Sequence, residues 1–257
     1  MALFEATSDE VYKKNAIEHA NYLMKCQQQD DLDVNVPLKG FFWRTPEKES
    51  INLYVHASHE QDFVVGLVKL AQLFPSESAE WKKAIKLYAD FYKEICTYTA
   101  PYDMIPCGIY DVTKTRNETD IEQIKSGIKL SERYYLKRFP VWGSFRGNSG
   151  TTLSQAKGLA VIANFLEDKA LQDIAYRAFD WHLGVNPFTQ SLMYGEGHHF
   201  AGQFSVTSGN LVGGLPVGVQ THFNRDEPYW PAENCYNWKE IWVHPSTRWL
   251  MLACDFF

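Results

Sequence analysis

The feature that most constrains this chain is a helix stop followed by a long aromatic loop, between residues 180 and 236. Gly184 follows a helical pattern and can adopt the positive φ angle of a helix C-terminus without a Cβ penalty. Asn186 then lies before Pro187 and is extended, because a residue before proline disfavours the α region. The following residues are rich in Gly, His, Tyr and Trp without helical period. So long a loop is usually functional or disordered, and its aromatic content argues against disorder.

The rest of the chain contains a series of helical patterns. Apolar spacing and start or stop signals predict helices over about residues 8–28, 58–74, 78–98, 150–165, 168–184 and 245–256. Short links make the second and third helices antiparallel neighbours, and likewise the fourth and fifth. Strand signals are weak except around residues 210–220, where a short hairpin is expected, while residues 134–139 are expected to be extended or helical. We therefore predict one all-α domain over residues 1–257, built from αα-hairpins with long loops rich in aromatic residues and glycine on one face.

Composition excludes several classes of partner. The 25 basic and 31 acidic residues give a net charge of −6, which disfavours nucleic acid, because phosphate binding depends on Lys and Arg. No stretch approaches the roughly 20 apolar residues of a membrane span, and the N-terminus lacks the basic and apolar regions of a signal peptide. Aromatic residues make up 15% of the chain, which suits a helical core or a surface that stacks on sugars.

Cysteine and histidine spacing predicts neither a metal site nor a cofactor. The five cysteines are widely spaced and form no Cys-x-x-Cys pair, so they are expected to be free and mostly buried thiols. His56 and His59 are three residues apart and are followed by Glu60 and Asp62, but a third definite ligand is absent from this pattern.

Three ordered motifs in the loop region resemble a known family. Leu-Gly-Val-Asn-Pro at residues 183–187 is followed by Ser191 and by Gly-Glu-Gly at residues 195–197, and Leu-Val-Gly-Gly occupies residues 211–214. In order and spacing these motifs resemble segments near the end of the catalytic domains of glycoside hydrolase family 9. The resemblance covers about residues 147–257, including the helical pair before the loop. Over residues 54–98 it is only a helical pattern.

The resemblance implies an (α/α)6 toroid of six helical hairpins and the hydrolysis of β-linked glucan-type oligosaccharides or polysaccharides with inversion. The family's two base-positioning aspartates lie in an Asp-Ala-Gly-Asp motif, which this chain does not contain. The chain therefore resembles the C-terminal half of such an enzyme, as a natural fragment, a truncated product or a variant whose base comes from elsewhere. An incomplete toroid would leave apolar faces for self-association or for a missing N-terminal half. The family implies a secreted or periplasmic location.

The resemblance assigns the role of general acid to Glu240. An inverting mechanism needs that acid on one side of the glycosidic oxygen and a base carboxylate roughly 6.5–9.5 Å away, with room for water. Trp238, Trp242 and Trp249 are close to it in sequence and would give it apolar surroundings. The alternative is that Asn237-x-x-Glu240 forms a helix capping pattern without chemistry. Glu233 is the second candidate for the acid.

The remaining candidates would bind the sugar. His198 and His199 resemble the paired histidines of the family's His-His-Arg sugar-binding motif, with Phe200 in place of the arginine. Candidates for stacking on sugar rings or bonding to ligand oxygens are Tyr194, Tyr229, Trp230, Arg146 and Glu196. The alternatives are surface histidines, core aromatics, an ion pair for the arginine and a solvated turn for the glutamate.

Three functions are therefore considered. The leading hypothesis is a glycoside hydrolase with Glu240 as the proton donor. The second is a non-catalytic carbohydrate-binding or partner-completed helical fragment, which would bind oligosaccharides without hydrolysing them. The third is another enzyme with an α/α toroid, such as a uronic-acid hydrolase or lyase.

Overall fold

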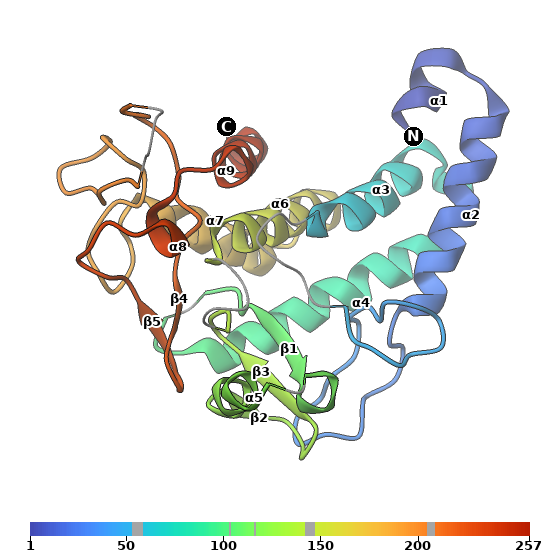
Figure 1. The fold of residues 1–257 in the computed structure, drawn as a ribbon. Coiled ribbons are helices and arrows are strands. Elements are labelled where there is room, and N and C mark those ends of the chain that lie inside the picture. The colour runs from blue at the N-terminus through green and yellow to red at the C-terminus, as the bar shows by residue number, and fades with distance from the viewer. Residues whose placement is uncertain (53–58, 103, 116, 142–146, 205–208) are drawn as a thin grey trace.

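The computed structural model describes residues 1–52, 59–102, 104–115, 117–141, 147–204 and 209–257 (Figure 1). The six predicted helices are present, with ends within a few residues of those expected: α2 (Glu10–Cys26), α3 (Glu60–Leu73), α4 (Ala79–Cys96), α6 (Ser149–Leu166), α7 (Lys169–Leu183) and α9 (Val243–Phe256). Shorter helices are α1 (Ala2–Thr7), α5 (Glu118–Lys125) and α8 (Tyr236–Lys239), with 3-10 turns η1 (Pro75–Glu77), η2 (Thr97–Thr99) and η3 (Val112–Lys114). Within these ranges, none of the helices combines the length and the apolar character needed to cross a bilayer.

Helix α6 is the centre of the core. Its buried residues are distributed around the whole helix and include Leu153, Leu159 and Ile162, each with no exposed surface. A helix buried on every side belongs to a protein core rather than to its surface. The small residues of its sequence, Ser-Gly-Thr-Thr at the start and several alanines later, let neighbouring helices approach closely. Accordingly, α6 contacts α3, α4, α7 and α9.

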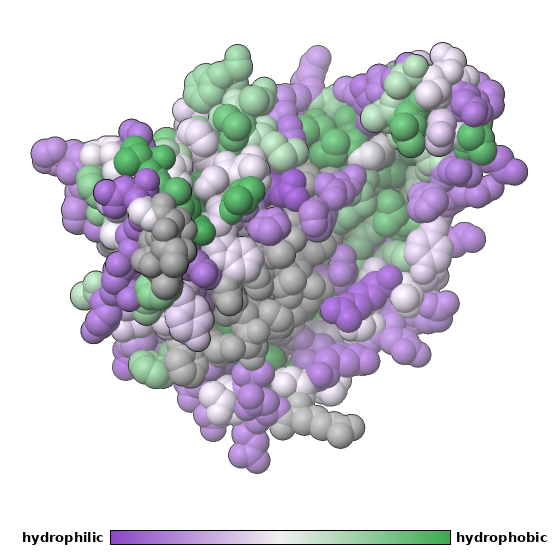
Figure 2. Space-filling model, turned by 45° about the horizontal axis from the view of Figure 1, so that its top comes forward, coloured by the Kyte–Doolittle hydropathy of each residue, from purple (hydrophilic) through white to green (hydrophobic). Residues whose placement is uncertain are grey.

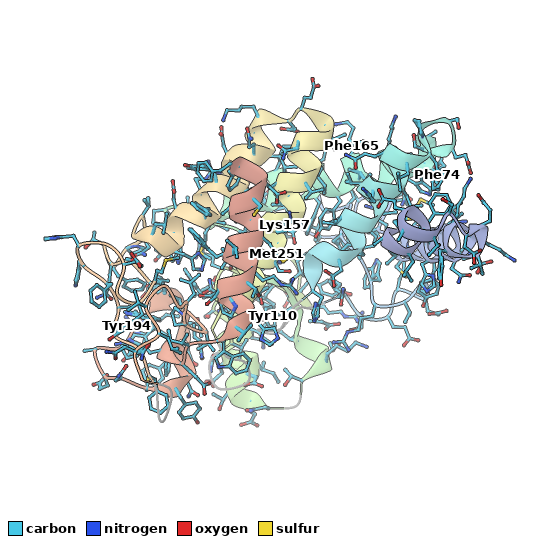
Figure 3. All side chains as sticks on the ribbon, turned by 90° about the horizontal axis from the view of Figure 1, so that it is seen from above. Phe74, Tyr110, Lys157, Phe165, Tyr194 and Met251 are labelled. Atoms are coloured by element: carbon cyan, nitrogen blue, oxygen red, sulfur yellow. The ribbon has the colours of Figure 1, made fainter. Side chains whose placement is uncertain are left out.

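The long helices form two layers. Helices α3, α6 and α9 contact one another in that order, and so do α2, α4 and α7. Figure 3 shows α9, α6 and α3 side by side, and an ion pair between Lys157 of α6 and Asp255 of α9 at 2.5 Å joins two of them. This arrangement is expected for part of a helical toroid, and the described residues do not close a ring.

The first-layer helices α3, α6 and α9 begin at the same end of the molecule. His59, which precedes α3, lies 2.9 Å from Arg248 in the first turns of α9, measured between Nδ1 and Nη2. Ser149, the first residue of α6, donates its N–H to the carbonyl of Val217, whose own N–H donates to the carbonyl of Glu240, just before α9. Loops that precede these helices therefore meet in one region.

The described residues are mostly helical, as predicted, but short strands are also present. A sheet with the order β1-β3-β2 contains β1 (Gly108–Asp111), β2 (Ile128–Lys129) and β3 (Tyr134–Lys137), all antiparallel. Residues 134–139 were expected to be extended or helical, and β3 shows that residues 134–137 are extended. Because every residue of β3 is buried, the strand lacks the alternation of apolar and polar residues that would have decided between the two. The expected hairpin at residues 210–220 occurs later, as β4 (Gln220–His222) and β5 (Arg225–Tyr229).

Some of the residues that the sequence predicts as helix caps do cap their helices, and others do not. Asp168 accepts the N–H of Leu171 at 3.1 Å and caps α7, and Gly184 ends that helix with a φ of +116°. Ser78 does not cap α4, because its hydroxyl donates to the carbonyl of Pro75 instead. Helix α2 is capped by Asp9, and α9 begins two residues before Pro245. A proline in the first turn of a helix is tolerated because its missing N–H would have no intrahelical partner there. The Ser-His-Glu-Gln pattern at residues 58–61 also predicts Ser58 as the cap of α3, but Ser58 lies outside the described residues.

Apolar side chains remain exposed on several helices. Val243 and Leu250 of α9 are 75% and 60% exposed, and Leu3 of α1 and Val11 of α2 are 57% and 48% exposed. In Figure 2, hydrophobic residues are visible at the top of the molecule and in the hollow beside the N-terminal helices on the right. Scattered apolar residues are normal on a surface, whereas a contiguous patch indicates an interaction site.

A buried ion pair joins the small sheet to the β4–β5 hairpin. Lys137 of β3 and Asp226 of β5 are almost completely buried, with the Nζ and Oδ1 atoms 2.9 Å apart. The carboxylate of Asp226 also accepts the backbone N–H groups of Arg138 and Phe139. Burial lowers the pKa of Lys137, and the neighbouring Asp226 carboxylate opposes that change. The pair is held by several partners, as a buried charge requires.

We expect Lys137→Met to destabilise the protein by about 3 kcal/mol or more, because it removes the buried cation nearest to the Asp226 carboxylate and leaves only Arg138 at 3.9 Å. Urea unfolding followed by circular dichroism measures the change. Lys129→Met, which removes a lysine paired with Glu132 on the surface, is the matched control and should have little effect. Equal stability of the two variants would contradict a stabilising role for the buried pair.

Candidate active site

An extended segment, residues 215–221, fixes the region where α3, α6 and α9 begin. Its apolar side chains Leu215, Val217 and Val219 are at most 1% exposed. On one side its main chain bonds to residues 238–242, and on the other to Pro140, Asn148 and Ser149. The bonds are Trp242 N to Leu215 O, Val217 N to Glu240 O, Gly218 N to Trp238 O, Ser149 N to Val217 O, Asn148 N to Val219 O and Thr221 N to Pro140 O. The side chain of Asn148 also accepts the N–H of Val219 at 3.0 Å. The position of Glu240 relative to α6 therefore depends on this segment.

Two glycines allow the close approach of the segment to α6. A Cβ atom on Gly147 would lie 2.0 Å from the carbonyl oxygen of Gly218, and a Cβ atom on Gly218 would lie 2.2 Å from Oγ of Ser149. Gly218 also has a φ of +105°, which side-chain-bearing residues rarely adopt. Both positions thus require glycine.

Glu240 directly follows α8 and is half-buried. Its Oε2 accepts a hydrogen bond of 2.6 Å from the indole nitrogen of Trp242. Asn237 lies inside α8 and does not cap α9, so the capping alternative for Glu240 is wrong. The other two tryptophans have different neighbours: Trp249 stacks on Phe179, and Trp238 contacts the edge of Tyr229.

Asn186 organises the turn that leaves α7. Its side-chain amide donates to the carbonyl groups of Trp181 and Gln190 at 2.7 and 2.9 Å, and its side-chain oxygen accepts the N–H of Phe188. An asparagine that bonds nearby backbone groups in this way fixes a turn locally. The Asn-Pro motif therefore positions the loop that contains the candidate sugar-binding residues.

Gln190 joins two of the predicted sugar-binding residues. Its Oε1 accepts the indole N–H of Trp230 at 3.0 Å, and its Nε2 lies 3.2 Å from Nε2 of His199. The ammonium of Lys239, the residue before Glu240, lies 5.4 Å from the centre of the Trp230 ring, a cation–π distance. Nothing in the local sequence distinguishes Gln190 as the link between these groups, and we did not predict it.

The two predicted tyrosines pack against other side chains. The hydroxyl of Tyr194 donates to Asn210 at 3.2 Å, and its ring meets Phe200 edge to face. Tyr229 stacks on His222 with ring centres 4.4 Å apart. One face of the Tyr229 ring is thus already covered, which reduces its surface for stacking on a sugar.

The other predicted residues are separate from this cluster. Glu196, His198 and Glu233 are exposed, and their side-chain oxygen and nitrogen atoms make no hydrogen bond within the described part of the chain. Arg146 and His56 lie outside the described residues. All five cysteines are unpaired, and Cys26, Cys96 and Cys107 are buried. Among the described residues, no three His, Cys, Asp or Glu side chains are grouped so that they could hold a metal ion.

Comparison with known proteins identifies the fold. No protein-family model and no curated protein matches the sequence. Among solved structures, the chain has a fold of the kind found in a helical cellulase. It is similar to the cellulase Cel9M of C. cellulolyticum, with a TM-score of 0.55 and 16% identity over 98% of this chain and 47% of that one. It is also similar to Cel9M in complex with cellobiose, with a TM-score of 0.52 and 16% identity over 99% of this chain and 49% of that one. The chain spans about half the length of the cellulase.

We expect Gly218→Ala to destabilise the protein by at least about 2 kcal/mol, because the new Cβ atom combines backbone strain with overlap on Ser149. Gly66→Ala is the matched control. This glycine lies within α3 and has open space around its Cα, so alanine there should stabilise by about 0.5–1 kcal/mol. Thermal and urea unfolding measure both changes, and a neutral Gly218→Ala variant would contradict the close packing.

We expect His182 to make the protein less stable at acid pH. This residue of α7 is buried, its Nδ1 lies 2.8 Å from the carbonyl of Ala178, and burial lowers its pKa from 6.5 to about 4. Between these values the unfolded chain binds a proton that the native state excludes. Stability should therefore fall as the pH decreases from about 6.5 to 4, by roughly 3 kcal/mol in total.

Urea unfolding from pH 8 to pH 5 tests this expectation in the native protein and in His182→Gln. The variant should lose less stability than the native protein over this range, whatever its stability at pH 8. His198→Gln, which removes an exposed imidazole, controls for the loss of a histidine. Parallel pH profiles for the native protein and His182→Gln would contradict the prediction.

Proposed function

We propose that this chain is glycoside hydrolase-like, that it acts on β-linked glucan-type oligosaccharides or polysaccharides, and that Glu240 is the general acid. The observation that supports this most is the position of Glu240. It lies on a fixed main-chain segment at the end where α3, α6 and α9 begin, in a fold similar to that of a cellulase. Carboxyl groups that act on sugars need such fixed positions, because the proton must reach one particular oxygen atom.

In the proposed reaction Glu240 donates its proton to the glycosidic oxygen as the bond to the sugar breaks. A second carboxylate removes a proton from the water that attacks the opposite face of the ring, which inverts the anomeric centre. The indole N–H of Trp242 would hold the Glu240 carboxyl group in one orientation during this transfer. Since the sequence has no Asp-Ala-Gly-Asp motif, we propose that the base comes from outside the segments matched here.

We further propose that the cluster of Gln190, His199 and Trp230 contributes to sugar binding. The amide and the imidazole could exchange hydrogen bonds with hydroxyl groups, and the indole offers an apolar face next to them. Lys239 contacts the Trp230 ring of this cluster and directly precedes Glu240 in the sequence. Tyr194, Glu196, His198, Tyr229 and Arg146 remain further candidates for contacts with a longer sugar chain, and Glu233 remains the second candidate for the acid.

The second candidate function is carbohydrate binding without hydrolysis. It is favoured by one observation: the sequence contains no Asp-Ala-Gly-Asp motif to supply the base. In this case a missing half or another copy of the chain would cover the exposed apolar residues of α9. Calorimetry with soluble glucan oligosaccharides, combined with an assay for reducing sugars, separates the two functions, because binding without release of reducing ends supports only the second.

We expect Glu240→Gln to lower the rate of oligosaccharide hydrolysis by roughly 10²–10⁴-fold, because glutamine has the same shape but cannot donate the proton. Glu233→Gln is the matched control and should keep most of the activity. Chromatography of the cleaved oligosaccharides measures both rates. If Glu240→Gln is fully active, or if Glu233→Gln alone loses its activity, Glu240 is not the acid.

A further inference from the structure

A cavity of about 520 Å³ lies against the end of α7. Pro101 and Tyr102, which follow η2, form one wall, and the end of α7 together with residues 184–189 forms the other. The volume is within the range of about 300–1,000 Å³ that is typical of small-molecule sites. The described lining residues do not include the cluster around Gln190, so the cavity is a candidate site of its own.

Both walls of this cavity are held by contacts inside the protein. On the α7 side, the side-chain amide of Asn186 donates to the carbonyl of Trp181 at 2.7 Å. On the other side, the Tyr102 ring meets the buried Phe139 ring edge to face, with ring centres 5.4 Å apart. The Phe139 ring centre is in turn 6.3 Å from that of Trp181. A ligand would therefore meet a largely preformed site, which lowers the entropic cost of binding.

The spacing of the lining residues shows which face of α7 borders the cavity. Arg177, Asp180 and Trp181 of the helix and its cap residue Gly184 all line it. Residues that follow one another by three, one and three positions lie on one face of a helix. The side chain of Asp180 is therefore on the cavity side of α7.

The carboxylate of Asp180 lacks a partner inside the protein. It is half-buried, yet it makes no hydrogen bond or ion pair with any described residue. Burial raises the pKa of this carboxyl group, and neither a neighbouring charge nor a hydrogen bond opposes the change. A partly buried carboxylate without a donor is unfavourable, so a ligand that supplies hydroxyl groups would be stabilised here.

Two other polar groups of the lining also have no partner among the residues that the structure describes. The hydroxyl of Tyr102 makes no hydrogen bond, and the indole N–H of Trp181 is buried without an acceptor. The remaining lining includes apolar surface from Pro101, Val185 and Pro187. The cavity thus combines unused hydrogen-bonding groups with an apolar wall.

The charges of the lining limit which ligand would fit. Arg177 and Asp180 are the charged residues among the described lining, and they lie about one helical turn apart with opposite signs. A ligand with a net charge would be repelled by one of the two, so an uncharged ligand is favoured. The chemistry suits a neutral molecule with several hydroxyl groups and an apolar ring face, which are the properties of a sugar.

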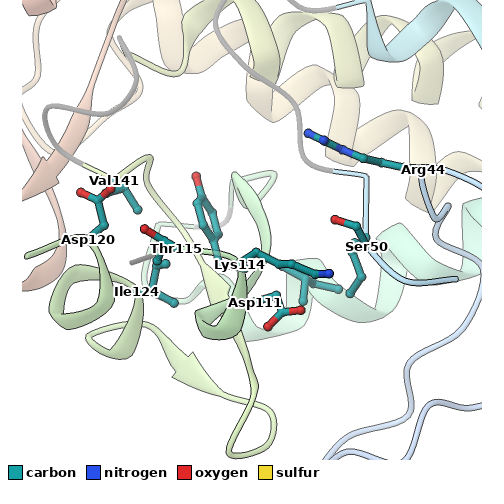
Figure 4. A pocket seen from close by; sticks show the side chains of 11 residues that line it. Arg44, Ser50, Asp111, Lys114, Thr115, Asp120, Ile124 and Val141 are labelled. Atoms are coloured by element: carbon teal, nitrogen blue, oxygen red, sulfur yellow. The ribbon is translucent and has the colours of Figure 1, made fainter. Parts of the chain in front are cut away.

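A second cavity, of about 440 Å³, lies between the loop that contains Arg44 and the small sheet. In Figure 4, Arg44 is on the side opposite to Asp120. The carboxylates of this cavity are engaged: Asp111 accepts hydrogen bonds from Arg133 at 2.6 and 2.8 Å, and Asp120 also has an interaction partner. The comparison favours the cavity at α7 as the site for a ligand rich in hydroxyl groups.

We propose that the cavity at the end of α7 binds an uncharged sugar ring through Asp180. The carboxylate accepts sugar hydroxyl groups, the Tyr102 hydroxyl makes a further hydrogen bond, and the apolar wall packs on the C–H face of the ring. The choice of a sugar rests on the proposed function, whereas the requirement for an uncharged ligand rests on the lining. Thr189 lines the cavity, and its carbonyl lies 3.3 Å from Nδ1 of His199. The site is therefore a further binding site for a glucan-type substrate, next to the cluster around Gln190.

NMR of the tryptophan indole N–H groups in the full chain, with glucose and cellobiose as ligands, tests the proposal. The resonance of Trp181, assigned with Trp181→Phe, should shift when either sugar is added, because this ring lines the cavity. The resonance of Trp249 should not shift, because its indole N–H is also buried but the residue is outside the lining. Asp180→Asn should weaken binding at least about ten-fold, and Tyr102→Phe about three-fold.

Asp173→Asn is the matched control and should leave binding unchanged, because this aspartate of α7 pairs with Lys169 on the surface, outside the cavity. The proposal is overturned if Trp181 does not shift, if folded Asp180→Asn binds as the native protein does, or if Asp173→Asn loses as much. Tighter binding of ethylammonium or acetate than of the sugars would overturn it as well. If circular dichroism shows that Asp180→Asn does not fold, Tyr102→Phe decides in its place.

The hydrolysis assay is independent of this measurement. A sugar-dependent shift of Trp181 without hydrolysis would reject the proposed function but keep the site. Hydrolysis of glucan oligosaccharides without any shift of Trp181 would do the opposite.

Discussion

The main-chain hydrogen bonds of residues 215–221 are the constraint on which the candidate site depends. This segment is mostly irregular, yet its N–H and C=O groups are bonded on both sides, to the residues before α9 and to those before α6. Buried backbone groups must be paired, so the segment has little freedom to move without breaking several bonds at once. The contact between Gly147 and Gly218 makes this close packing possible. The position of Glu240 is therefore determined by backbone geometry more than by its own side-chain contacts.

The helices of this protein could be predicted from its sequence because their signals are local. Apolar spacing, Asp168 and Gly184 define the ends of α7 without knowledge of any partner. The pairing of β1 with β3 could not be predicted, since β3 is buried along its whole length and the paired residues are more than twenty positions apart in the sequence. The burial of Lys137 beside Asp226 was missed for the same reason: a lysine next to an arginine in a strand appears from the sequence to be solvated.

In the candidate site, too, local features could be predicted from the sequence and long-range contacts could not. Gly184 and the Asn-Pro motif predicted where α7 ends, and Asn186 bonds the backbone groups of the turn that follows. By contrast, the bond between Gln190 and Trp230 joins residues forty positions apart, and no local pattern predicts it. Stacking platforms were predicted from residue type alone. The structure shows that Tyr229 is already stacked on His222, so residue type is a poor guide to the accessibility of a ring.

Net charge and local charge lead to different conclusions about ligands. A net charge of −6 disfavours a polyanion, whose many charges interact with the field of the whole molecule. A single carboxylate interacts mainly with groups within a Debye length of about 8–10 Å, so its binding depends on the charges around one site and not on the net charge.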